Sequence, residues 1–105
     1  MKYNNRLNRA LEKLKKLPEF TRHYLRNRSI GKMVPFVGTS GLDFQKMSCE
    51  EVIITIPNKR KVQNHIHQVH AAATVLLAET ASGMVVGMNI PDDKLPLMKS
   101  LSAKY

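Results

Sequence analysis

The residues best suited to chemistry lie where a polar, histidine-rich segment leads into an apolar run of small residues. From Val62 to Pro91 the only formally charged residue is Glu79. We predict a helix from about Val69 to Ser82. The 100° step of a helix places Glu79 on the same apolar face as Ala72 and Val75. A carboxylate is costly to bury on such a face, and carboxylates of this kind concentrate at working sites. Glu79 is therefore either catalytic or structural, and a structural Glu79 would be satisfied by hydrogen bonds or would lie at a subunit interface.

The start of the same helix holds a second group of candidates. No Ser, Thr or Asp directly precedes the helix as a cap. The backbone N–H groups of His70, Ala71 and Ala72 are therefore candidates for holding an anion or a carbonyl oxygen. The small side chains of the alanines let a ligand approach the backbone. This is the chemistry of an oxyanion site, in which His70 would be a positioning residue.

The spacing of the two groups has a consequence for any reaction that uses both. Ala71 and Glu79 are separated by roughly 12 Å along a helix axis, because each residue adds about 1.5 Å. A carbonyl oxygen held at the helix start is out of reach of Glu79 of the same chain. Two antiparallel helices around a two-fold axis would bring Glu79 of a second copy to that point. An enzymatic function therefore requires a dimer with two composite sites.

Three histidines near the helix start suggest a metal site as an alternative. His65, His67 and His70 are ligand types that zinc prefers. No Cys, Asp or further His lies near them in the sequence to complete a coordination shell. We therefore expect neither a metal nor a cofactor.

The elements that must position these residues are predicted from periodicity and turn signals. Residues 3–17 form an amphipathic helix and residues 19–28 a second, shorter one. Residues 29–32 are a linker. The clearest strand covers residues 51–56, where four β-branched residues follow one another. Further predicted strands cover 33–38, 42–47 and 84–90, another begins at 99–105, and Gly83 would cap the helix that precedes the strand at 84–90.

The net charge of +9 is distributed unevenly. Residues 1–32 hold ten Lys and Arg against two Glu, whereas residues 33–105 hold seven against six Asp and Glu. We therefore divide the chain into a basic helical segment, 1–32, and a domain, 33–105. The basic segment is either a packing helix with a solvated face or a contact for an anionic membrane surface. We expect no nucleic-acid partner because no aromatic-rich nucleic-acid motif accompanies it.

Two further features concern the environment of the chain. The single cysteine, Cys49, excludes an internal disulfide and agrees with a reducing compartment. The first residues lack the apolar core of a secretory signal. The apolar run at 71–88 contains Glu79 and two glycines, which argue against a membrane-spanning helix. We expect a cytoplasmic protein. The basic run 59–61 is either a solvated turn or a phosphate contact.

The site residues also carry a resemblance to a known family. Asn64, then His70-Ala71-Ala72 six residues later and Glu79 fifteen residues after the Asn, resemble the hotdog-fold acyl-CoA thioesterases of the phenylacetic-acid-degradation type. Their pattern is Asn-x-x-Gly-x-x-His-Gly-Gly, followed by a carboxylate on the central helix. The resemblance covers about residues 33–105 and is greatest to an uncharacterised branch of that superfamily.

The resemblance implies an α+β hotdog fold, in which an antiparallel sheet wraps around a long central helix, here with N-terminal helices added. It implies a homodimer or a dimer of dimers and an acyl-CoA or acyl-carrier thioester as substrate. Asn64 and the Ala71 N–H would polarise the thioester carbonyl. Glu79 of the partner would act as base or nucleophile. His67, Ala72 and Val75 would contact the substrate.

The sequence departs from the family pattern at three positions and at its end. His67 replaces the first Gly of the pattern, and Ala71 and Ala72 replace the Gly pair, which adds methyl groups where the thioester would lie. The chain ends where the family continues with further strands, so we expect an incomplete sheet. Three functions remain open: a thioesterase, a non-catalytic hotdog module that binds an acyl ligand or a protein partner, or a protein that binds an anionic surface through the basic residues 1–32.

Overall fold

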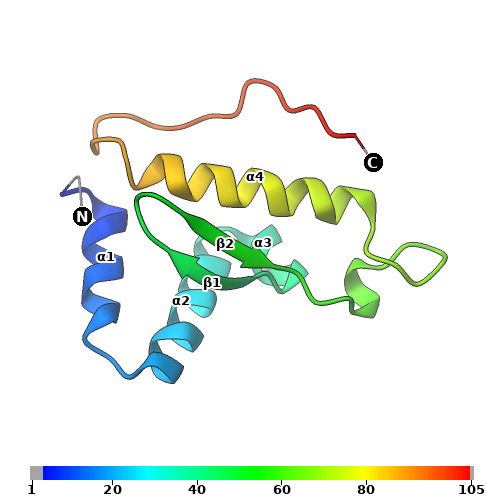
Figure 1. Ribbon diagram of the computed structural model, residues 1–105, viewed down its shortest axis with the longest axis horizontal. Helices are drawn as coiled ribbons and strands as arrows, with labels where there is room; N and C mark the ends of the chain where they lie inside the picture. Colours follow the sequence, from blue (N-terminus) through cyan, green and yellow to red (C-terminus); the bar gives the residue numbers. More distant parts are fainter. Residues whose placement is uncertain (1–3, 105) are drawn as a thin grey trace.

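The computed structural model describes residues 4–104 and shows an α+β arrangement (Figure 1). A two-stranded antiparallel sheet lies between a long C-terminal helix and the N-terminal helices. The elements in chain order are α1 (Arg6–Lys15), α2 (Glu19–Met33), α3 (Pro35–Ser40), β1 (Asp43–Met47), β2 (Val52–Thr55), the short 3₁₀ helix η1 (Arg60–Val62) and α4 (Ala71–Gly87).

The sheet is a hairpin whose register breaks once. Phe44 pairs with Ile54 and Lys46 pairs with Ile53, so an irregularity of one residue falls between Phe44 and Lys46. Phe44 and Ile54 are both buried. The hairpin therefore presents a buried pair to the helices, as a sheet with one apolar face does.

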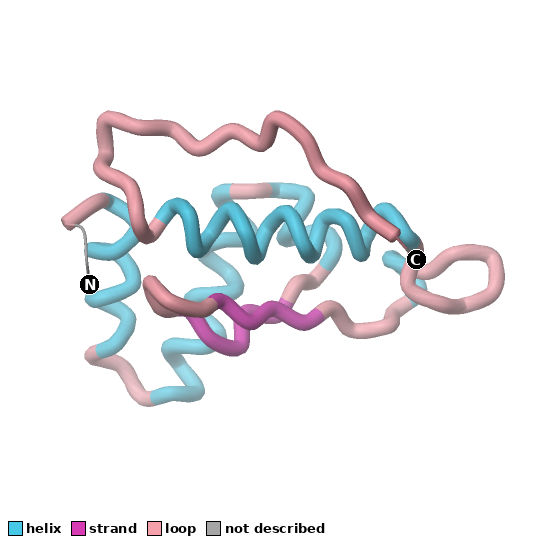
Figure 2. The backbone as a smooth tube through the Cα atoms, turned by 45° about the horizontal axis from the view of Figure 1, so that its top comes forward, coloured by secondary structure: helices cyan, strands magenta, loops and turns pink. Residues whose placement is uncertain are grey.

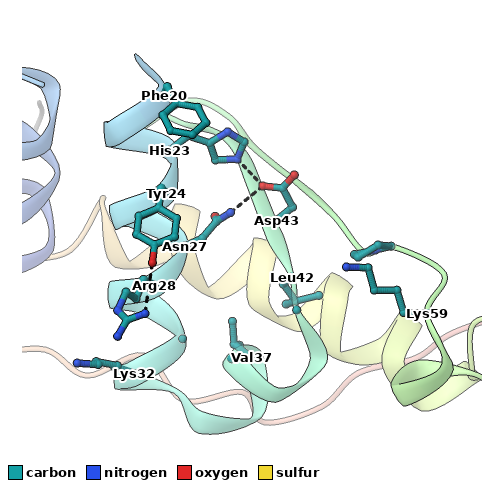
Figure 3. Close-up of a pocket in the computed structure, with 14 residues that line it drawn as sticks. Phe20, His23, Tyr24, Asn27, Arg28, Lys32, Val37, Leu42, Asp43 and Lys59 are labelled. Carbon is teal, nitrogen blue, oxygen red and sulfur yellow. Dashed lines mark hydrogen bonds and ion pairs between the residues drawn. The ribbon is translucent and has the colours of Figure 1, made fainter. Parts of the chain in front are cut away.

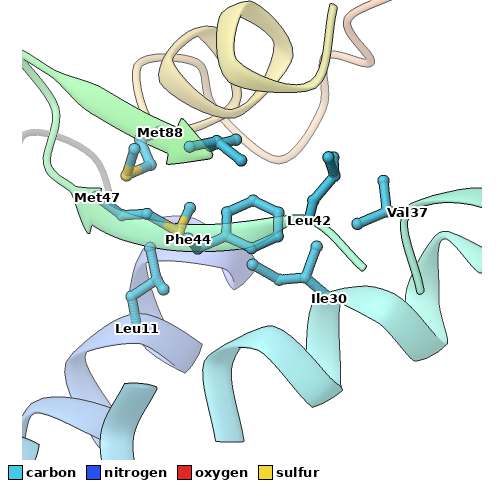
Figure 4. Close-up of a cluster of buried hydrophobic side chains, with 8 residues drawn as sticks. Leu11, Ile30, Val37, Leu42, Phe44, Met47 and Met88 are labelled. Carbon is cyan, nitrogen blue, oxygen red and sulfur yellow. The ribbon is translucent and has the colours of Figure 1, made fainter. Parts of the chain in front are cut away.

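The core joins both halves of the chain (Figure 4). Phe44 and Met88 are 0% exposed. Helices α1 and α2 supply Leu11 and Ile30, so the basic N-terminal segment packs on the sheet and its charged face is left to solvent. The full cluster of buried apolar residues is Leu11, Ile30, Val37, Leu42, Phe44, Met47, Ile54 and Met88.

Two buried asparagines tie the start of α1 to the end of α4. Asn5 caps α1, since its Oδ1 accepts from the Asn8 N–H at 2.8 Å. Its Nδ2 donates to the carbonyl oxygens of Gly87 at 3.0 Å and Ile90 at 2.7 Å. Asn8 Nδ2 donates to Met88 O at 3.0 Å. These bonds satisfy carbonyl groups at a helix end that would otherwise lack partners.

Several predicted elements are confirmed and others are wrong. The helix predicted at 3–17 is present as α1, although residue 3 lies outside the described residues, and the strand predicted at 51–56 is present as β2. Residues 29–32 continue α2 and are not a linker. Residues 35–40 are helical and not a strand, because Pro35 starts a short helix that ends at Gly41 with a φ of 72°.

The largest error concerns the end of α4. The helix was expected to stop at Gly83, with a strand over 84–90, but it continues to Gly87. Met84 packs against the core and the asparagines of α1 bind the chain beyond it, so tertiary contacts extend the helix. Residues 99–104 form no strand, and Tyr105 lies outside the described residues.

None of the helices within residues 4–104 combines the length and apolar character that crossing a membrane requires.

Candidate functional site

Glu79 lies on the side of α4 that faces away from the hairpin. Ala73 and Thr80 are buried on the opposite side, whereas Glu79 is half-buried. Residues 91–104 fold back along this outer side (Figures 1 and 2). Between them and α4 is a cavity of about 490 Å³, lined mostly by apolar side chains and including Glu79, Val86 and Leu97.

The Glu79 carboxylate makes no hydrogen bond or ion pair with residues 4–104. The structural alternative, in which hydrogen bonds satisfy a buried Glu79, is therefore not what the structure shows. A half-buried carboxylate beside an apolar cavity keeps its oxygens available to a proton, a water molecule or a ligand.

Asn64 organises the turn that leads into α4. Its Oδ1 accepts from the backbone N–H of Ile66 at 3.0 Å and of Gln68 at 3.1 Å. Its own N–H donates to Gln68 O at 2.8 Å. With the oxygen held from two sides, the orientation of the amide is fixed, and Nδ2 has no acceptor among residues 4–104. Asn64 lines a cavity of about 520 Å³ together with Asn58, Lys59, Arg60, Gln63, His65 and His67.

His67 has a φ of 61°, which places it in the left-handed region that glycine favours. This is the position at which the thioesterase pattern carries its first Gly. Replacing that Gly by His therefore has a conformational cost in addition to placing an imidazole at the cavity.

The start of α4 is capped, contrary to the prediction. His70 Nδ1 accepts from the Ala72 N–H at 3.0 Å, and the His70 N–H donates to Val62 O at 2.7 Å. A histidine ring replaces the Ser, Thr or Asp that usually serves as cap. The N–H groups of His70 and Ala72, which were predicted to hold an oxyanion, are therefore already bonded within the chain. Ala71 is exposed at the helix start.

The structure brings some predicted site residues together and separates others. An antiparallel bridge between Gln63 and Val69 holds the Asn64 turn beside the start of α4. Glu79 lies on the same continuous helix as Ala71, so the separation of roughly 12 Å along the axis holds. Within one chain the predicted site residues therefore form two separate groups, the predicted half-sites, one at the start of α4 and one at Glu79.

The predicted substrate contacts lie at the start of α4 and along the helix toward Glu79. His67 and Ala72 lie exposed near the start of α4. Val75 is half-buried on the helix between the two half-sites. His65, His67 and His70 form no metal-binding cluster, and residues 4–104 contain no group of three His, Cys, Asp or Glu side chains placed to hold a metal ion.

Comparison with family models gives one match, over residues 23–105, which is most of the chain. The chain belongs to the family described as a domain of unknown function (DUF4442). Both half-sites fall inside the DUF4442 match. No curated protein and no solved structure matches the chain.

The DUF4442 match also contains a polar cluster that sequence reasoning missed (Figure 3). Asp43 at the start of β1 accepts hydrogen bonds from His23 and, at 2.8 Å, from Asn27 Nδ2 on α2. Burial by itself would raise the pKa of Asp43, but these hydrogen bonds and the charges of His23 and Arg26 lower it below its usual value. The four-residue spacing of His23 and Asn27 indicates that both side chains lie on one face of a helix. It does not indicate that Asp43 is their partner.

Proposed function

We propose that two copies of this chain form a hotdog-type dimer that hydrolyses a thioester of the acyl-CoA or acyl-carrier class. The observation that carries the proposal is the Glu79 carboxylate, which is half-buried, lacks a partner within residues 4–104 and borders an apolar cavity. A carboxylate in this situation is suited to act as a general base or nucleophile.

The position of the two-fold axis follows from the helix. In an antiparallel pair of identical helices, each residue of one chain faces a different residue of the partner. The two-fold axis passes the position whose residue number is midway between those two. For Glu79 to face the partner's helix start at Ala71, that residue is Val75. Val75 is half-buried and Ala72 is exposed on the same face, and both are small enough for two helices to approach to about 8–10 Å once residues 91–104, which lie along this side of α4, are displaced.

In the proposed reaction the amide of Asn64 donates from Nδ2 to the thioester carbonyl oxygen. Its fixed orientation means that no reorganisation is needed when negative charge develops on that oxygen. Glu79 of the partner accepts a proton from water, and the hydroxide oxygen attacks the carbonyl carbon. The tetrahedral intermediate collapses, the carbon–sulfur bond breaks, and the proton passes to the thiolate. His70 keeps the helix start in place, because its ring caps the Ala72 N–H.

The first test replaces Glu79 and Asn64, one at a time, by residues of the same shape that lack the proposed chemical group. Glu79→Gln removes the base and should lower kcat by about 10²–10⁴-fold on an acyl-CoA panel. Asn64→Asp keeps the oxygen that the Ile66 and Gln68 N–H groups need and removes only the Nδ2 donor, so it should lower kcat by about 10²–10³-fold. Circular dichroism and sedimentation should show both variants folded, with the oligomeric state of the wild type.

The second test asks whether each site is composite. A mixed dimer of Glu79→Gln and Asn64→Asp chains contains one site with both residues intact and one with neither. Random exchange makes about half of the dimers mixed, so the mixture should regain about a quarter of wild-type activity. Activity that stays at the level of the separate variants would show that Asn64 and Glu79 do not act together across a dimer, and would overturn the mechanism.

A non-catalytic acyl-binding module is the second candidate, and the residues at the helix start favour it. His67, Ala71 and Ala72 carry side chains where the thioesterase pattern has glycines. This candidate predicts that acyl-CoA raises the melting temperature of the wild type without being hydrolysed. Turnover that Glu79→Gln abolishes would exclude it.

A further inference from the structure

A third cavity, which shares no residue with the one at Glu79, lies where α2 faces the residues that follow β2 (Figure 3). It has a volume of about 680 Å³. One wall is α2 and the opposite wall includes Lys59, with Val37 and Leu42 between them. This volume is in the usual range for sites that bind small molecules.

The α2 wall carries four side chains in an ordered row. Phe20, Tyr24, Arg28 and Lys32 follow at intervals of four residues and line the cavity. Successive members of such a row lie about 6 Å apart along the helix. The two aromatic side chains are 86% and 56% exposed, so neither is used in the core. The row runs from aromatic rings to cations, as Figure 3 shows.

The charge of the cavity is positive. Arg28, Lys32 and Lys59 make no ion pair with any carboxylate in residues 4–104. Arg28 donates only to the Tyr24 hydroxyl, at 3.3 Å. The one carboxylate in the lining, Asp43, is already bonded to His23 and Asn27. Cations without acidic partners in a concave surface attract an anionic ligand.

We propose that this groove binds a nucleotide. The base stacks on Phe20, the sugar lies against Tyr24, and the phosphate groups contact Arg28 and Lys32. Lys59 on the opposite wall adds to the positive charge of the groove. Aromatic side chains stack on any base, and guanidinium and ammonium groups bind phosphate oxygens by charge-assisted hydrogen bonds. The order of ring, ring, cation and cation matches the order of base, sugar and two phosphates in a nucleoside diphosphate. This proposal does not depend on thioester hydrolysis, because Phe20, Tyr24, Arg28 and Lys32 lie outside the cavities at Asn64 and Glu79; only Lys59 also lines the Asn64 cavity.

The first experiment measures calorimetric binding of ADP, adenosine and inorganic pyrophosphate to the full chain at low ionic strength, without metal ions. The double variant Arg28→Ala/Lys32→Ala should weaken ADP binding by about 10-fold or more, which corresponds to the loss of about 1.4 kcal/mol. Lys13→Ala/Lys16→Ala is the matched control. It removes the same charge from exposed positions on and next to α1, and should change the affinity by less than about two-fold.

The second experiment tests the aromatic part of the site. Phe20→Ala is expected to fold normally because Phe20 is almost fully exposed. It should weaken ADP binding by about 5–10-fold through lost stacking and leave pyrophosphate binding unchanged. The proposal is overturned if the wild type does not bind ADP, if both double variants weaken binding equally, or if pyrophosphate binds as tightly as ADP. It is also overturned if a single-stranded oligonucleotide responds to these variants while ADP does not, since the site would then belong to a polymer.

Discussion

The hydrogen bonds by which Asn5 joins the start of α1 to the end of α4 offer the sharpest test of how this fold is held together. Asn5 is 3% exposed and makes three hydrogen bonds, one to the Asn8 N–H and two to the carbonyls of Gly87 and Ile90. Asn5→Ala removes a helix cap, which costs about 1 kcal/mol. It also leaves two carbonyl groups without their donor, at about 1 kcal/mol each. The free energy of unfolding should therefore fall by about 3 kcal/mol.

Urea unfolding followed by circular dichroism measures this change, and the melting temperature should fall by about 15 °C. Asn5→Asp separates the two roles of the side chain. Aspartate is an equally good cap, but it places a negative charge against two carbonyl oxygens, so at neutral pH it should destabilise at least as much as Ala. Asn4→Ala is the control, because Asn4 is exposed and should change stability by less than about 0.5 kcal/mol. If Asn5→Asp has the same free energy of unfolding as the wild type, Asn5 acts only as a cap. The hydrogen bonds to Gly87 and Ile90 would then not stabilise the fold.

Three further predictions concern backbone conformation and pH. His67→Gly should raise the free energy of unfolding by about 0.5–1 kcal/mol, because it relieves a φ of 61° on an exposed residue; a lower melting temperature would contradict this. Gly38→Ala should destabilise by more than about 2 kcal/mol, because its Cβ would lie 2.7 Å from Gly31 O, whereas Gly83→Ala in α4 has open space and should stabilise by up to about 1 kcal/mol in the same urea titration. The folded-state pKa of Asp43 lies below its unfolded value of about 3.9, so its contribution to stability is complete above that value and is lost as the pH falls through the folded pKa. The difference in unfolding free energy between wild type and Asp43→Asn should shrink as the pH falls from about 5 through the folded-state pKa, and a constant difference would show that ionisation of Asp43 is not involved.

Local sequence patterns predicted the elements whose signal is local. The apolar spacing of α1 and the β-branched run of β2 each carry a complete periodicity within a few residues, and both elements are present. The same helix arithmetic separated Ala71 from Glu79, and α4 joins them as one continuous helix. That separation, which is the reason for proposing a dimer, needed no tertiary information.

The remaining features depended on contacts between residues distant in the sequence. The apolar run after Gly83 suits a strand or a buried helix equally well, and the packing of Met84 together with the binding of Asn5 to Gly87 selected the helix. The groove beside α2, proposed to bind a nucleotide, also required α2 and the residues after β2 to meet. The sequence by itself determined which groups α4 carries and how far apart they lie, because helix geometry is local. Only the tertiary structure decided where α4 ends, which of its N–H groups are occupied and which of its faces is left open, because those properties depend on contacts that the rest of the chain supplies.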